Sequence, residues 1–121
     1  MFKRGALYTT ISRIEVLSNK ECLFHMNDLT EAGEVIQRLL NRSATYRRGG
    51  GEINFIFGYN SEDRKCVFIK ADDNSDLNQV FPLLILFAVV SGGQAQYVAD
   101  ALAIRLEEKS HLVTSNLSVS K

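Results

Sequence analysis

The sequence lacks a hydrophobic run long enough to cross a lipid bilayer. Its longest apolar stretch, Val80–Val90, is well short of the ~20 residues of a membrane-spanning helix, and Gly92 and Gly93 follow closely. A secretion signal is also missing, because Thr, Ser and Arg interrupt the segment after Lys3 and Arg4 too early for an apolar core. We therefore expect a cytoplasmic protein that contacts no membrane.

Cysteine is scarce and net charge is absent. Only Cys22 and Cys66 occur among 121 residues, too few for a disulfide framework, so we expect both as thiols in a reducing cytosol. The 14 basic residues balance the 14 acidic ones. No overall field then draws the protein toward nucleic acid or an anionic membrane, and a charged partner has to be met by a local patch.

What is present suits one small domain. A chain of 121 residues with 45% hydrophobic residues supports a single ordinary core. We predict a single α+β domain over residues 1–110. Residues 111–121 are expected to form a tail that is partly disordered or adds a strand.

The spacing of apolar residues predicts the order of the elements. Alternation at Leu7, Thr9 and Ile11 is typical of a strand, whereas Asp28 with Glu31 resembles the capping box of a helix. The predicted strands cover residues 6–17, 22–26, 53–59 and 65–71, and the predicted helices cover 29–42, about 81–90 and about 94–109.

The order ββαββαα predicts a small antiparallel sheet of two hairpins with helices packed on one face. If the tail forms a strand, the alternative is a ferredoxin-like βαββαβ arrangement. On the third strand, Phe55, Phe57 and Tyr59 share one face, which we expect to be the core face.

An arginine-rich segment is the best candidate for an anion or nucleic-acid site. Three glycines follow it, and the freedom of their backbone predicts that residues 47–51 form a connector rather than helix. Arginine side chains suit phosphate, and an aromatic ring can stack on a base. The candidates are Arg38, Arg42, Tyr46, Arg47 and Arg48. The alternative is that Arg38 pairs with Glu34 and the others solubilise a mobile loop.

The evidence for a metal site is weak. Cys22 and His25 have a C-x-x-H spacing, and Cys66 with His111 would complete four ligands only if three distant segments converged. On the predicted strands, both cysteines are more simply buried apolar residues. We predict no metal, no cofactor and no catalytic residue, since no local base or orienting group accompanies either thiol.

The segment Val80–Val90 is apolar on nearly every side. A small domain rarely surrounds such a helix completely, so its outer side is expected to pack against another subunit or a partner. Small residues in the next helix would allow a close approach of the two helices. The interface candidates are Phe81, Leu84, Phe87, Val90, Ala95 and Ala99. The alternative is a helix that is central within its own domain.

These patterns favour a non-enzymatic protein-binding module of the inhibitor, immunity or adaptor kind, which forms a homodimer or binds another protein through the helical pair. The alternative is a nucleic-acid or anionic-ligand binder that uses the arginine patch. A third hypothesis is an enzyme whose groups meet only in the fold, with Cys22, His25, Asp100 and His111 as available side chains.

Overall fold

The computed structural model describes the backbone of residues 10–119 and the side chains of residues 10–105. Within this part of the chain, four strands form one antiparallel sheet in the spatial order β1-β2-β4-β3. The strands are β1 (Arg13–Val16), β2 (Glu21–His25), β3 (Phe55–Tyr59) and β4 (Cys66–Ala71). The helices described are α1 (Leu29–Arg48), α2 (Leu77–Leu86) and α3 (Gly92–Val119).

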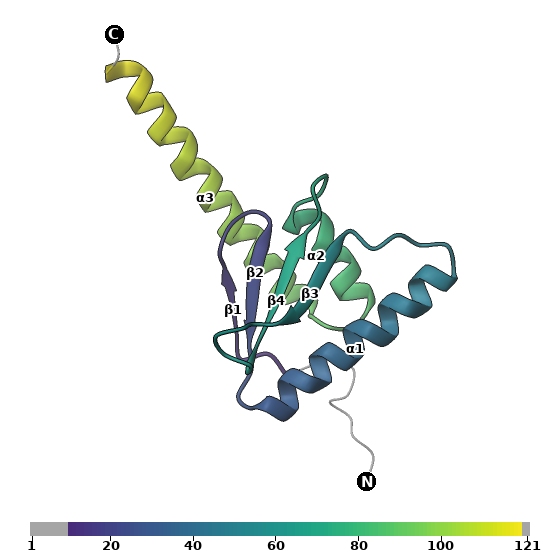
Figure 1. Ribbon diagram of the computed structural model, residues 1–121. Coiled ribbons are helices and arrows are strands. Elements are labelled where there is room, and N and C mark those ends of the chain that lie inside the picture. Colours follow the sequence, from purple (N-terminus) through teal and green to yellow (C-terminus); the bar gives the residue numbers. More distant parts are fainter. Residues whose placement is uncertain (1–9, 120–121) are drawn as a thin grey trace.

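The helices all pack on one face of the sheet. In Figure 1, α2 and α3 lie behind the strands, and the buried side chains of the helices join those of the sheet in one cluster. The predicted order ββαββαα and the antiparallel sheet are therefore confirmed. Within residues 10–119, no helix combines the length and apolarity that crossing a bilayer requires.

The first helix begins where its cap predicts and ends later than predicted. The Asp28 carboxylate accepts a hydrogen bond from the backbone N–H of Glu31 (2.9 Å), and the Glu31 carboxylate accepts one from Asn27 (3.0 Å). The helix then runs past residue 42 to Arg48, so the expectation that Arg47 and Arg48 lie in a connector is wrong. Their positive charges stabilise the last turn, where the helix dipole is negative.

The second helix begins at Leu77, earlier than the predicted residue 81. Asp76 and Gln79 form a reciprocal capping box, in which each side chain accepts a hydrogen bond from the backbone N–H of the other. The chain reverses at Ala88, which has φ 59, and not at Gly92 and Gly93, which begin α3.

The backbone of α3 is helical through residue 119, so the ferredoxin-like alternative with a C-terminal strand is not needed. Figure 1 shows the end of this helix extending away from the sheet. The part of the first predicted strand before residue 10 lies outside the described residues, as do residues 120–121.

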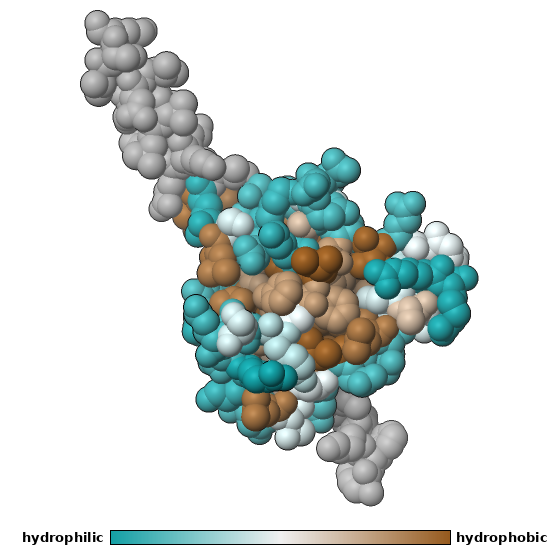
Figure 2. All heavy atoms as spheres, viewed as in Figure 1, coloured by the Kyte–Doolittle hydropathy of each residue, from teal (hydrophilic) through white to brown (hydrophobic). Residues whose placement is uncertain are grey.

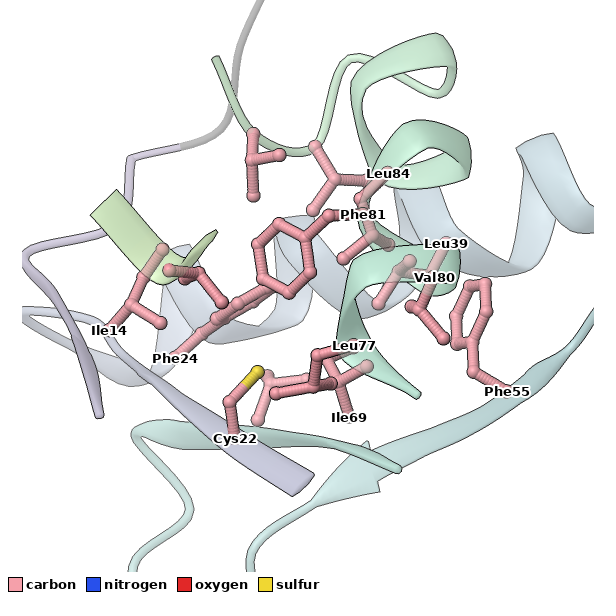
Figure 3. Close-up of a cluster of buried hydrophobic side chains, with 14 of the residues drawn as sticks. Ile14, Cys22, Phe24, Leu39, Phe55, Ile69, Leu77, Val80, Phe81 and Leu84 are labelled. Carbon is pink, nitrogen blue, oxygen red and sulfur yellow. The ribbon is translucent and has the colours of Figure 1, made fainter. Parts of the chain in front are cut away.

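The core lies between the sheet and the helices. Figure 3 shows Phe24 of β2 and Phe81 of α2 pointing toward each other, and their rings meet edge to face with centroids 6.2 Å apart. Cys22 lies in the same layer, and Phe55 of β3 packs beside Leu39 of α1. The predicted core face of β3 is therefore confirmed.

The strained turn at Ala88 generates a prediction about stability. The left-handed region costs a residue with a Cβ about 1 kcal/mol, whereas glycine adopts it freely. We expect Ala88→Gly to raise the free energy of unfolding by about 0.5 kcal/mol in urea denaturation. The control Ala44→Gly, at an exposed position inside α1, should lower that free energy by about 1 kcal/mol. Equal destabilisation by both variants would contradict the left-handed turn.

Candidate functional site

The face of the sheet opposite the helices is left uncovered by the described residues. Strand residues alternate between the two faces, so those that do not enter the core point outward here. The outward residues are Arg13 and Glu15 of β1, Glu21, Leu23 and His25 of β2, Ile56 and Gly58 of β3, and Cys66, Phe68 and Lys70 of β4.

The centre of this face is apolar. Leu23 lies directly opposite Phe68, and Phe68 lies directly opposite Gly58 on the next strand. Ile56, near Gly58 on β3, is 59% exposed. We call Leu23, Ile56, Gly58 and Phe68 the outer sheet patch. Figure 2 shows hydrophobic residues gathered over the strands, with hydrophilic residues around them.

The aromatic ring of the outer sheet patch, Phe68, reaches over Gly58 of the neighbouring strand. A Cβ added to Gly58 would come within 2.9 Å of Cε2 of Phe68, so the ring covers the place where a side chain would stand. An aromatic ring over a glycine of a neighbouring strand protects the backbone that the glycine leaves bare. Because Gly58 has no side chain, nothing at this position of β3 projects above the Phe68 ring.

Charged residues of both signs surround the outer sheet patch. At one end, Glu21 lies opposite Lys70. At the other end, the Glu15 carboxylate is 2.9 Å from Nε2 of His25 and 3.8 Å from the Arg13 guanidinium. An apolar centre with a polar rim is typical of protein interaction surfaces.

At this second end the fold also assembles a thiol, an imidazole and a carboxylate. Sγ of Cys66 lies 3.0 Å from Nδ1 of His25, whose Nε2 contacts Glu15. Sequence reasoning grouped His25 with Cys66 only as possible metal ligands and missed Glu15, because the three residues come from three strands. The same arrangement of groups activates thiols in some enzymes.

The environment of Cys66 opposes that activation. The residue is only 3% exposed, and burial raises the pKa of its thiol. The Asp63 carboxylate, 3.7 Å from Sγ, raises this pKa further because it repels a thiolate. Sγ of Cys66 thus lies within hydrogen-bond reach of both Nδ1 of His25 and the Asp63 carboxylate, and Nε2 of His25 is within reach of Glu15. These contacts hold the His25 ring in place at the rim.

The C-x-x-H pair does not converge. Residues three apart on a strand point to opposite faces, so Cys22 enters the core while His25 points outward. Among the described residues, no three His, Cys, Asp or Glu side chains are grouped so that they could hold a metal ion. The side chain of His111 lies outside the described residues.

The arginine patch is not gathered into one site. Arg38 donates a hydrogen bond to the backbone carbonyl of Ala88 (3.0 Å), and Tyr46 packs edge-on against Phe87 with centroids 5.6 Å apart. These two residues attach α1 to the turn between α2 and α3. The other three predicted residues are exposed, and helical spacing turns them toward different sides of α1; they are Arg42, Arg47 and Arg48.

The predicted helical interface lies largely in the core. Four of its six residues are at most 3% exposed, because the sheet and α1 cover them; they are Phe81, Leu84, Phe87 and Val90. Ala95 and Ala99 are half-buried between α2 and α3. A partner approaching these helices would instead meet exposed side chains such as Leu86 and Tyr97.

The buried thiols generate a prediction about pH. Burial raises the pKa of Cys22 from 9.0 to about 12, so the native state keeps a proton that the unfolded state loses above pH 9. Stability is therefore complete below pH 9 and falls as pH rises toward 12, by about 1 kcal/mol between pH 9 and 10 for this residue. Urea denaturation of the wild type should show this loss, and Cys22→Ala should show a smaller one. Identical pH slopes for the two proteins would contradict it.

We compared the chain with family models, curated proteins and solved structures, and none of them matches it.

Proposed function

We propose that the protein is a non-enzymatic protein-binding module that self-associates through the outer face of its sheet. The outer sheet patch is the observation that carries this proposal. The solvated face of an antiparallel sheet normally carries polar side chains, whereas here Leu23 and Phe68 occupy its centre and Ile56 lies on the neighbouring edge strand. Ile56 is exposed and Leu23 and Phe68 are half-buried, and apolar surface of this kind inside a polar rim favours a face that another protein covers.

The outer sheet patch takes the place of the helical pair as the interface. Phe81 and Phe87 already contact Phe24 and Tyr46 of their own chain, so they have little surface left for a partner. The patch has no such cover among the described residues. A module of this kind acts by occupying a surface, as inhibitors and adaptors do.

The non-enzymatic part of the proposal is supported by the state of the thiol cluster. A nucleophilic cysteine needs access to substrate and a thiolate form. Cys66 is nearly covered, and its pKa is raised by burial and by Asp63. The described part of the chain thus offers a sheet face with a polar rim, part of which is hydrogen-bonded, and this arrangement suits recognition.

Two matched substitutions test the proposed surface. Ile56 on the sheet and Leu86 on α2 are equally exposed, at 59% and 60%, so a glutamate at either position is not buried within its own chain. We expect light scattering after size-exclusion chromatography to find a dimer for the wild type and for Leu86→Glu, and a folded monomer for Ile56→Glu. Burying a charge against an apolar surface accounts for the dissociation.

Circular dichroism and thermal melting of both variants provide the control for folding. A wild type that stays monomeric at every concentration tested would contradict self-association. Dissociation by Leu86→Glu instead of Ile56→Glu would move the interface back to the helices.

A further inference from the structure

We propose a second binding surface, a groove between β1 and α3 that takes up an extended, acidic peptide of a partner protein as an added strand. This surface is separate from the outer sheet patch and goes beyond self-association. Figure 1 shows β1 as the outermost strand on the side from which α3 extends. An added strand needs free backbone groups at the edge of a sheet and places for its alternate side chains, and the groove supplies both.

The backbone of β1 offers hydrogen-bonding groups at its outer edge. Leu17 donates to the backbone carbonyl of Glu21 (2.9 Å), so the antiparallel register also turns the N–H and C=O groups of Glu15 toward β2. The backbone groups of Ile14 and Val16 therefore point away from β2. The described part of the chain places no strand beside them, and they remain available to a peptide backbone.

The groove beside this edge consists of two adjoining hollows of about 440 and 310 Å³, and Ile14 and Tyr97 line both. Tyr97, Ala101 and Ile104 recur at helical spacing and form one face of α3 along the strand. Tyr97 is 57% exposed and Ile104 is 56% exposed, so the wall of the groove is apolar and open to a ligand. A strand added beside β1 would direct every second side chain onto this wall.

The charges along the groove indicate which peptide fits. Arg105 lies at one end, where its guanidinium donates to the carbonyl of Leu17 (2.9 Å). The Glu15 carboxylate is already held by His25 at 2.9 Å. Arg13 contacts the same carboxylate at 3.8 Å, yet its side chain is 61% exposed. Two guanidinium groups beside one engaged carboxylate favour a ligand with acidic side chains.

These features together define the pattern of the ligand. Its apolar side chains face Tyr97 and Ile104, and the side chains between them lie beside Arg13 on the outer face of the sheet. We therefore expect apolar residues to alternate with acidic ones over about five residues, the length of an average strand. Main-chain hydrogen bonds supply affinity in this arrangement, and the alternating side chains supply specificity.

A fluorescein-labelled peptide in which valine alternates with glutamate tests the groove, and a valine–lysine peptide is its matched control. Fluorescence anisotropy should show binding of the glutamate peptide and about tenfold weaker binding of the lysine peptide. Ile104→Glu places a charge on the apolar wall and should weaken binding by about tenfold. Leu86→Glu, at an equally exposed position on α2, should leave binding unchanged. No binding to the wild type, or equal losses in the two variants, would overturn the proposal.

N-methylation of the peptide tests strand pairing, because it removes backbone donors without changing side chains. The N–H groups of successive residues in a strand point to opposite edges, so only every second one faces β1. Methylating all valines or all glutamates should therefore give different results, with about a tenfold loss for one set and little change for the other. Equal losses for both sets, or none for either, would exclude an added strand.

Amide hydrogen exchange identifies the edge that the peptide covers. In the complex, the N–H groups of Ile14 and Val16 should exchange about tenfold more slowly than in the free protein. The N–H of Glu15 faces β2 and should change little. Protection of Ile14 and Val16 already in the free protein would mean that the chain itself covers this edge, which would overturn the proposal.

The same variants separate this groove from the self-associating face. If Ile56→Glu dissociates the wild-type dimer and still binds the glutamate peptide, both surfaces are supported. If Ile104→Glu dissociates the dimer instead, a second copy fills the groove and the partner peptide is overturned. A dimer that binds no peptide overturns the groove alone, whereas a monomer that binds the peptide overturns self-association alone.

Discussion

Packing of the helices on a single face of the sheet is the constraint on which the rest of the structure depends. The edge-to-face contact between Phe24 and Phe81 lies at the centre of that packing, and Leu39 and Phe55 extend it toward α1. Most of the buried apolar residues of the helices pack against this inner face of the sheet. Whatever the strands present on the other side is left to solvent or to another molecule, and the apolar residues there carry the proposed function.

The same packing explains how this small domain buries the apolar segment Val80–Val90. The length of α1 makes the difference, because its last three turns reach the turn between α2 and α3. Arg38 binds the carbonyl of Ala88, and Tyr46 covers Phe87. Side chains that a shorter α1 would have left exposed are thereby buried within the chain. Two residues of the predicted arginine patch, Arg38 and Tyr46, make these internal contacts.

Much of the fold could be predicted from the sequence, because local signals coincide with tertiary packing. The alternation of β3 identified its core face, and Asp28 with Glu31 identified the start of α1. The cap formed by Asp76 and Gln79 has the same spacing and was available as a signal for α2. The chain reversal at Ala88 had no signal in the sequence, since alanine rarely adopts a left-handed conformation.

The outer sheet patch and the thiol cluster could not be predicted in the same way. Leu23 and Phe68 are far apart in the chain, and only the register of β2 with β4 places them together. The position of Gly58 under the Phe68 ring has a further consequence. Any side chain at position 58 acts as a wedge that lifts the ring and turns a smooth surface into a ridge, so the smallest residue of β3 controls how closely another sheet can approach.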